Sequence, residues 1–175
     1  CLGEIKATVE RINFFIENFE GRMTPNRVHQ DSQAALLEEI RFDPLGVIAN
    51  ISAWNYPYFV GSNVFVPALL TGNAVLYKPS EFASLTGEHI VKAIVDAGFD
   101  PDLMPLIIGD GSVGRELLEL DVQGVFFTGS YQTGVKISEA TASKMIRVQL
   151  ELGGKDPVYV CEDVDVSTAA AGISD

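Results

Sequence analysis

The chain has 175 residues, of which 47% are hydrophobic and 21% charged, so it can bury a sizeable core and does not call for a second complete domain. Its 24 acidic and 12 basic residues give a net charge of −12, which argues against nucleic acid and anionic membrane surfaces as partners. No apolar run reaches the roughly 18 residues of a membrane span, and we find no signal peptide, disulfide framework or metal site. We therefore expect a soluble, cytoplasmic protein with reduced thiols.

Residues 1–43 are predicted to stand apart from the rest of the chain. Residues 4–20 carry apolar side chains at helical spacing, which predicts an amphipathic helix that needs a packing partner. Over residues 21–41 the periodicity weakens and turn-forming residues appear. A surface excursion or a hairpin is expected there.

Residues 44–175 alternate between strand and helix patterns. Strands are predicted over residues 46–52, 74–77, 106–108, 124–127, 146–150 and 158–161. Helices are predicted over residues 58–70, 85–97, 113–120, 132–142 and 166–173. Strands that are separated by helical segments of about ten to fifteen residues imply right-handed crossovers. The sequence therefore predicts an α/β fold with a doubly wound, mainly parallel sheet, cut off within its last helix.

A literal G-x-G-x-x-G motif follows the third predicted strand, with glycines at Gly109, Gly111 and Gly114. Such glycines can let a backbone approach a pyrophosphate at the start of a helix. The dinucleotide fingerprint, however, follows the first strand of its unit and expects an acidic residue about 20 positions later, where this chain has Gly129. An ordinary turn is the favoured interpretation, and a phosphate loop stays open.

Two other strand ends suit a nucleotide. Glu81 follows the second predicted strand, where dinucleotide-binding folds place the carboxylate that binds the adenosine ribose, and Lys78 can donate to the same sugar. In isolation, a solvated Lys and Glu around a turn is the favoured interpretation of these two residues. Farther along, Gly129 lies between Thr128 and Ser130, whose hydroxyls can cap the next helix or contact phosphate.

Two strand ends suit acyl chemistry. Asn55 follows the first predicted strand, and its amide can donate to a developing oxyanion, although an asparagine there is also an ordinary turn residue. Glu151 ends an apolar strand before Gly153 and Gly154, and a carboxylate in a partly dry place can act as a general base for water. A surface glutamate at a strand end is the competing interpretation.

Four segments resemble the aldehyde dehydrogenase superfamily in their order and residues, and they are PLGVIANISAWNYP, GNAVLYKPSE, FTGSYQTG and VQLELGGKDP. The resemblance implies that residues 44–175 form a Rossmann-like, NAD(P)-binding domain that is incomplete at its carboxyl end, in a fragment without the catalytic domain. The parent enzyme would oxidise an aldehyde to a carboxylic acid. NAD is favoured over NADP because a 2′-phosphate beside the Glu81 carboxylate would be repelled.

The resemblance also implies a role for each candidate residue. Lys78 and Glu81 would hold the adenosine ribose, while the helix after Ser130 would lie beside the pyrophosphate. Asn55 would stabilise the oxyanion formed by a cysteine thiolate, and Glu151 would activate the water that releases the acid. The other residues expected at the cofactor site are Ser52, Trp54, Ser80, Gly109, Gly111, Gly114, Phe127, Thr128, Gly129, Leu152 and Gly153.

The chain departs from the family pattern in three places. Val64 stands where many members carry a lysine, and Ala53 stands where a proline is frequent. The resemblance implies that the nucleophilic cysteine lies roughly thirty to thirty-five residues after Glu151, and therefore beyond Asp175. Cys161 ends an apolar predicted strand and is expected to be a buried structural thiol, and Cys1 has no motif around it. The chain alone is therefore expected to be inactive.

The full-length protein is expected to be a homo-oligomer, either a dimer or a tetramer. Two alternatives from other functional classes stay open. The chain can be a catalytically inactive nucleotide-binding or regulatory module, or a structural fragment whose first helix is an assembly interface.

Overall fold

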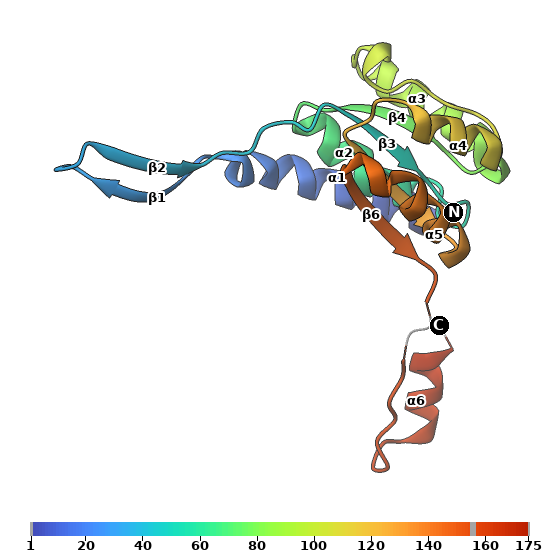
Figure 1. Cartoon of the computed structure of the whole chain (residues 1–175). Helices are drawn as coiled ribbons and strands as arrows, with labels where there is room; N and C mark the ends of the chain where they lie inside the picture. Colours follow the sequence, from blue (N-terminus) through green and yellow to red (C-terminus); the bar gives the residue numbers. More distant parts are fainter. Residues whose placement is uncertain (1, 155–156, 175) are drawn as a thin grey trace.

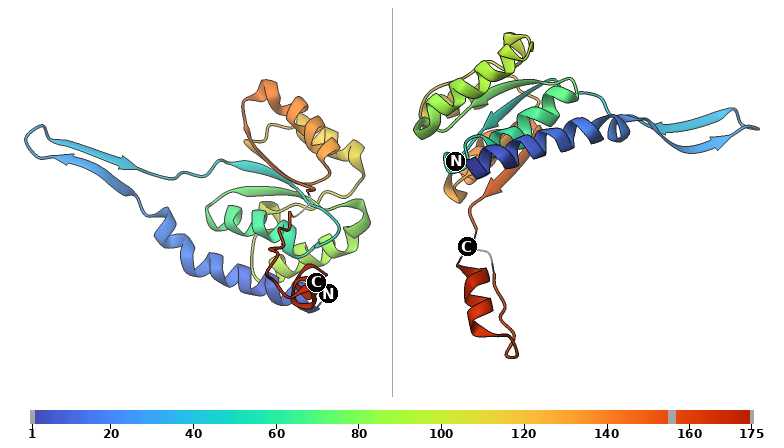
Figure 2. Two further views of the ribbon diagram at one scale, coloured as in Figure 1. Left: turned by 90° about the horizontal axis from the view of Figure 1, so that it is seen from below. Right: turned by 180° about the vertical axis from the view of Figure 1, so that it is seen from behind.

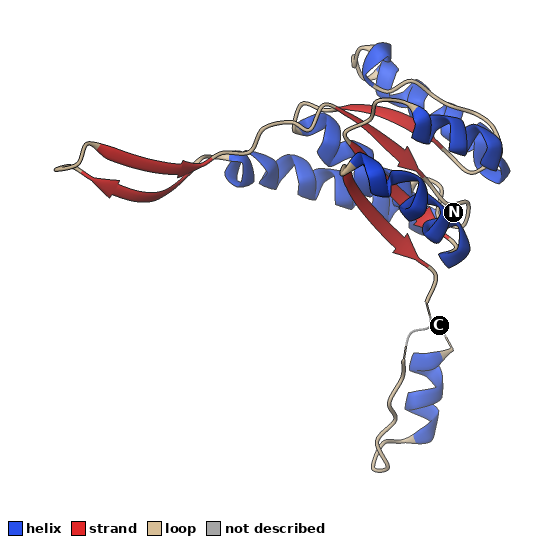
Figure 3. Ribbon diagram, viewed as in Figure 1, coloured by secondary structure: helices blue, strands red, loops and turns tan. Residues whose placement is uncertain are grey.

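A parallel sheet of four strands, in the order β4-β3-β5-β6, forms the centre of the molecule (Figures 1 and 3). The computed structural model describes residues 2–154 and 157–174. The four strands are β3 (Val47–Ile51), β4 (Ala74–Lys78), β5 (Gly124–Gly129) and β6 (Arg147–Leu152). Since β4 and β5 pair with opposite edges of β3, the order of the sheet reverses at β3. The predicted α/β fold with a doubly wound parallel sheet is confirmed.

Helices cover both faces of this sheet (Figure 2). Successive residues of a strand point to opposite faces, and on β3 Ile48 packs with Phe65 and Ile90 while Ala49 packs with Leu117 and Ile137. Two hydrophobic cores therefore lie on the two sides of the sheet. The helices that contribute to them are α2 (Phe59–Leu70), α3 (Ser84–Asp96), α4 (Gly111–Glu119) and α5 (Tyr131–Thr141). Short 3-10 helices are η1 (Glu81–Ala83), η2 (Pro101–Leu103) and η3 (Ala142–Lys144).

The amino-terminal part consists of a long helix and a hairpin. Helix α1 (Leu2–Met23) packs along α2, which provides the partner that its amphipathic pattern requires. Strands β1 (Asn26–Asp31) and β2 (Leu36–Ile40) pair antiparallel and project from the body of the molecule (Figure 1). The predicted helix and the predicted hairpin are confirmed, while a domain boundary after residue 43 remains a prediction. No helix in the described ranges is long and apolar enough to cross a membrane.

Two predicted strands were wrong. Residues 106–108 form only a single bridge, between Leu106 and Tyr77 at the edge of β4, because Pro105 lacks an amide hydrogen and the chain turns at Gly109. Residues 158–161 pair with no described strand and run as irregular chain into α6 (Val166–Ile173). Residues 158–161 and α6 lie away from the body in Figure 1, and Tyr159 is 89% exposed.

The environment of Cys161 also differs from the expectation. The residue is exposed, so it is not the buried structural thiol that the apolar run predicted. The apolar residues around it have no neighbouring strand to pack against among the described residues. Cys1 lies outside the described residues.

Candidate functional site

A cleft of about 950 Å³ opens at the carboxyl ends of the four parallel strands. The reversal of strand order at β3 lies within its floor, which is where ligands bind in open α/β sheets. Every residue predicted for the site lines this cleft except Gly109. The structure therefore brings together strand ends that are far apart in the sequence.

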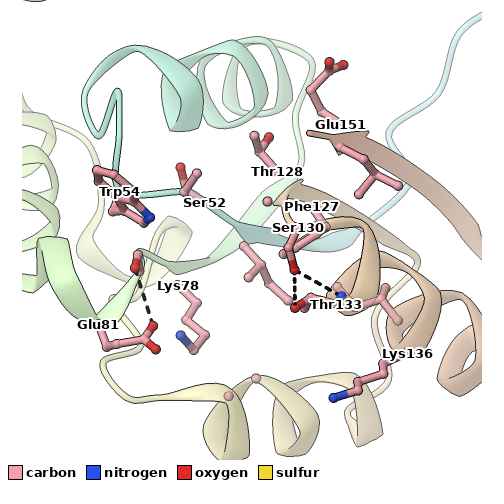
Figure 4. Close-up of a pocket in the computed structure, with 18 of the residues that line it drawn as sticks. Ser52, Trp54, Lys78, Glu81, Phe127, Thr128, Ser130, Thr133, Lys136 and Glu151 are labelled. Atoms are coloured by element: carbon pink, nitrogen blue, oxygen red, sulfur yellow. Dashed lines mark hydrogen bonds between the residues drawn. The ribbon is translucent and has the colours of Figure 1, made fainter. Parts of the chain in front are cut away.

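The end of β4 carries the Lys78 and Glu81 pair. Lys78 is only 3% exposed, and its Nζ donates to the carbonyl oxygen of Pro79 at 3.3 Å. Ser80 begins the short helix η1, and its Oγ donates to Glu81 Oε2 at 3.4 Å (Figure 4). Burial lowers the pKa of Lys78, an effect that the nearby carboxylates of Glu81 and Asp110 partly offset. The ammonium group of Lys78 can donate hydrogen bonds to the hydroxyl groups of a sugar, and the carboxylate of Glu81 can accept hydrogen bonds from them.

Ser52 follows β3 and holds a buried hydroxyl group at the floor of the cleft. The residue is 4% exposed, and its backbone N–H donates to the Lys78 carbonyl oxygen at 3.0 Å. Its Oγ has no hydrogen-bond partner in the part of the chain that the structure describes. Burial raises the pKa of neighbouring Tyr77 to about 12; the nearby Ser52 hydroxyl opposes this rise, although the two groups do not meet hydrogen-bond geometry. An unpaired buried hydroxyl costs about 1–3 kcal/mol, so the cleft fits a ligand with a polar group at this place.

The junction of β5 and α5 suits a phosphate. Ser130 is the N-cap of α5: its Oγ accepts from the Thr133 backbone N–H at 3.3 Å and lies 3.0 Å from Thr133 Oγ1 (Figure 4). The positive end of the helix dipole therefore faces the cleft, which favours an anion. Lys136 extends from the same helix toward α4.

The glycines of the literal G-x-G-x-x-G motif do not all line the cleft. Gly109 lies outside the cleft, and with its φ of +156° a side chain there would overlap Val113, so this glycine serves the turn into α4. Gly114 lines the cleft, and a Cβ there would lie 3.8 Å from Lys78 Cε. Gly111 lies in the first turn of α4, which Asp110 caps by accepting from the Ser112 N–H at 2.8 Å. Hydrogen bonds from the Ser112 hydroxyl, at 2.6 Å, and from the Ser112 N–H lower the pKa of Asp110.

The remaining predicted residues of the cleft include Trp54, expected at the cofactor site, and Asn55 and Glu151, expected to act on the substrate. Trp54, which is 63% exposed, and Asn55 belong to the loop between β3 and α2. Glu151 lies opposite Thr128 in the register of β5 and β6. It is exposed in the described chain, because β6 is the edge strand, so the partly dry surroundings expected for it are not found there.

Sequence reasoning missed the side chains that two helices contribute to the cleft. Helix α4 supplies Arg115 and Glu119, and α5 supplies Thr133 and Lys136. Their spacing of three or four residues marks one helical face, but the sequence alone did not show which face meets the cleft. The remaining unpredicted lining residues are Ile51, Ala53, Phe82, Leu118, Ile137 and Ala140.

Comparison with known proteins agrees with this geometry. The model of the aldehyde dehydrogenase family matches residues 1–175. N-succinylglutamate 5-semialdehyde dehydrogenase of Legionella pneumophila (strain Corby) is 34% identical over 167 residues, which are 95% of this chain and 33% of that protein. The chain thus spans about a third of the length of this relative.

Solved structures show the same relationship. PnpE in complex with nicotinamide adenine dinucleotide is 37% identical with a TM-score of 0.79, and the match covers 86% of this chain and 31% of that one. Succinic semialdehyde dehydrogenase from Streptococcus pyogenes, in complex with NADP+, shares the fold with a TM-score of 0.88 at 21% identity, over 97% of this chain and 37% of that one. The chain therefore belongs to the aldehyde dehydrogenase family.

Proposed function

We propose that the protein to which this chain belongs oxidises an aldehyde to a carboxylic acid, with a nicotinamide dinucleotide as the hydride acceptor. The observation that carries the proposal is the convergence of the strand-end residues on one cleft at the reversal point of the sheet. The unpaired hydroxyl of Ser52 and the helix terminus at Ser130 support a polar, anionic ligand in that cleft. Family membership supports the reaction class.

The residues at the nucleotide end would bind and orient the dinucleotide. Lys78 and Glu81 would hydrogen-bond to the adenosine ribose, and the amino end of α5 at Ser130 would receive the pyrophosphate. The bound nicotinamide would accept the hydride that leaves the substrate carbon. Trp54 and Ser52 would limit the position of the ligand at the floor of the cleft.

The residues at the substrate end would serve acyl transfer. A cysteine thiolate adds to the aldehyde carbon, and the Asn55 amide would donate to the resulting oxyanion. After the hydride has left, Glu151 would take a proton from the water that attacks the thioester, which releases the acid and restores the thiolate. The relative of Legionella is about three times as long as this chain, so we assign the thiolate to a part of the protein outside these 175 residues.

NAD is the proposed cofactor. The exposed carboxylate of Glu81 would accept from the ribose hydroxyls and would repel a 2′-phosphate. Arg115 and Lys136 line the same cleft and would reduce this repulsion, as would Lys78. Because Glu81 is the carboxylate expected at the ribose, we take it as the residue that sets the preference for NAD over NADP.

Three further features belong to the same proposal. Residues 44–175 would be the dinucleotide-binding domain, and residues 1–43 an amino-terminal extension of it. A homo-oligomer is supported by the exposed apolar side chains of the hairpin, among them Val28, Leu37 and Ile40. A cytoplasmic location is also proposed, and it agrees with Cys161 being a free thiol among the described residues.

The cofactor proposal is tested by measuring dissociation constants for NAD and NADP by isothermal titration calorimetry. Glu81→Gln removes the charge but keeps the shape, so NAD should bind roughly tenfold more weakly and NADP should gain relative to NAD. Glu88→Gln is the matched control, because Glu88 is exposed on α3 and does not line the cleft. Failure of the unaltered chain to bind either nucleotide would contradict the proposal. Aldehyde-dependent NADH formation by the full-length protein distinguishes an enzyme from an inactive nucleotide-binding module.

A further inference from the structure

The first turn of α2 lacks the cap that its own sequence would normally provide. Tyr58 occupies the N-cap position, and its side chain makes no capping hydrogen bond. The first backbone N–H groups of a helix have no partner within the helix and need acceptors from elsewhere. This terminus matters to the site, because the loop that carries Trp54 and Asn55 runs directly into it.

The missing acceptor comes from α1. Glu4 Oε1 accepts from the backbone N–H of Tyr58 at 2.8 Å and from that of Phe59 at 3.2 Å. A carboxylate at the amino end of a helix also interacts favourably with the helix dipole. Glu4 therefore replaces the absent cap from a position 54 residues earlier in the chain.

Other contacts fix α1 at this point. Thr8 is buried, and its hydroxyl donates to the Glu4 carbonyl oxygen at 2.9 Å. The guanidinium of Arg11 lies over the ring of Phe59, 5.6 Å from its centroid, and α1 runs beside α2 (Figure 2). Glu4 is thus held in place rather than free to leave the end of α2.

The cleft loop is consequently anchored at both of its ends. At its start, the Ser52 backbone N–H donates to the Lys78 carbonyl oxygen at 3.0 Å. At its end, Glu4 holds the amides of Tyr58 and Phe59. Trp54, between these anchors, is exposed, so few other contacts limit its position.

We propose that Glu4 is a positioning residue for the cleft, which sets the place of Trp54 and Asn55 by capping α2 from α1. The inference rests on the proposed function in taking these two residues as parts of the nucleotide and substrate site. It adds a residue outside the sheet and outside the cleft to those that determine the site. Residues 1–43 would then contribute to the geometry of the cleft through the contact of Glu4 with α2.

The test uses Trp54 as a reporter, because it is the only tryptophan in the 175-residue chain. Glu4→Ala should lower the fluorescence anisotropy of Trp54 well below the melting temperature and weaken NAD binding roughly fivefold, as loss of a helix cap would. Glu4→Gln keeps an acceptor oxygen without the charge and should give a smaller change of the same sign. Glu10→Ala, which removes a charge from an exposed position of the same helix, should match the unaltered chain.

Two results would overturn the inference. One is a Glu4→Ala variant with unchanged anisotropy and unchanged affinity, and the other is an equal effect of Glu10→Ala. If circular dichroism shows that Glu4→Ala does not fold, Glu4→Gln is measured in its place, and values equal to those of the unaltered chain then refute the role of the Glu4 carboxylate charge in positioning the loop. If the unaltered chain binds no dinucleotide, the proposed function fails, but the anisotropy still decides whether Glu4 positions the loop.

Discussion

Among single residues, Ser52 at the floor of the cleft is expected to lower the stability of the fold while it contributes to binding of the dinucleotide. Ser52 and Ser62 are both buried serines, but only Ser62 is satisfied, since its Oγ donates to the Phe59 carbonyl oxygen at 2.8 Å. Ser52→Ala removes an unpaired hydroxyl, so it should raise the free energy of unfolding by about 1 kcal/mol and weaken NAD binding several-fold.

Ser62→Ala provides the matched control for this prediction. It removes a formed hydrogen bond outside the cleft, so it should lower the free energy of unfolding by about 0.5–1 kcal/mol and leave NAD affinity unchanged. Urea unfolding and calorimetric titration measure the two quantities. A Ser52→Ala variant that is less stable but binds NAD normally would show that Ser52 is structural.

Lys78 is also expected to lower the stability of the fold while it binds the dinucleotide, and its effect on the free energy of unfolding depends on pH. Burial lowers its pKa from the ordinary value of 10.5, so the protonated side chain destabilises the folded state at neutral pH. The folded protein loses this proton before the unfolded chain does, so the penalty shrinks as pH rises from the lowered pKa toward 10.5. Lys78→Met should therefore be more stable than the unaltered chain at pH 7, and this advantage should decline in alkaline solution.

Unfolding free energies of the two proteins, measured from pH 7 to about pH 10, test this sign. Lys78→Met should also bind NAD at least about tenfold more weakly, because a charged hydrogen-bond donor is lost. A stability advantage of Lys78→Met that grows with pH would contradict burial as the dominant cause of the lowered pKa of Lys78.

At the scale of elements, local patterns predicted the helices and most strands correctly. Residues such as Asp110 and Ser130 begin their helices as N-caps, which is a signal contained in a few neighbouring positions. Residues 106–108 and 158–161 have the same apolar character as true strands. A strand, however, also needs a partner along its length, and a short apolar run does not show whether one is present.

The same limit explains which site residues were predicted. Strand ends meet at one edge of a parallel sheet whatever the details of packing, so Ser52, Lys78 and Ser130 could be grouped from the sequence. The contributions of Arg115 and Lys136 depend on which faces of α4 and α5 turn inward. Glu4 depends on the docking of α1 against a helix 54 residues away, and no local pattern reports that contact.

At the scale of the whole molecule, the sheet and its helices hold the cleft while two parts extend from this body. The hairpin β1–β2 projects on one side and the segment with α6 on another (Figure 1). Neither contributes one of its described residues to the lining of the cleft. The proposed binding of the dinucleotide therefore concerns the body, and its effects should be confined to it.

Hydrogen–deuterium exchange with and without NAD tests this central claim most directly. The account predicts slower exchange in residues 52–55, 78–82 and 128–134, which line or border the cleft, and unchanged exchange in β1, β2 and α6. The exposed amides of the hairpin serve as the internal control. Absence of protection in the three cleft segments, or protection confined to the smaller hollow of about 350 Å³ beside Met23 and Val64, would contradict it.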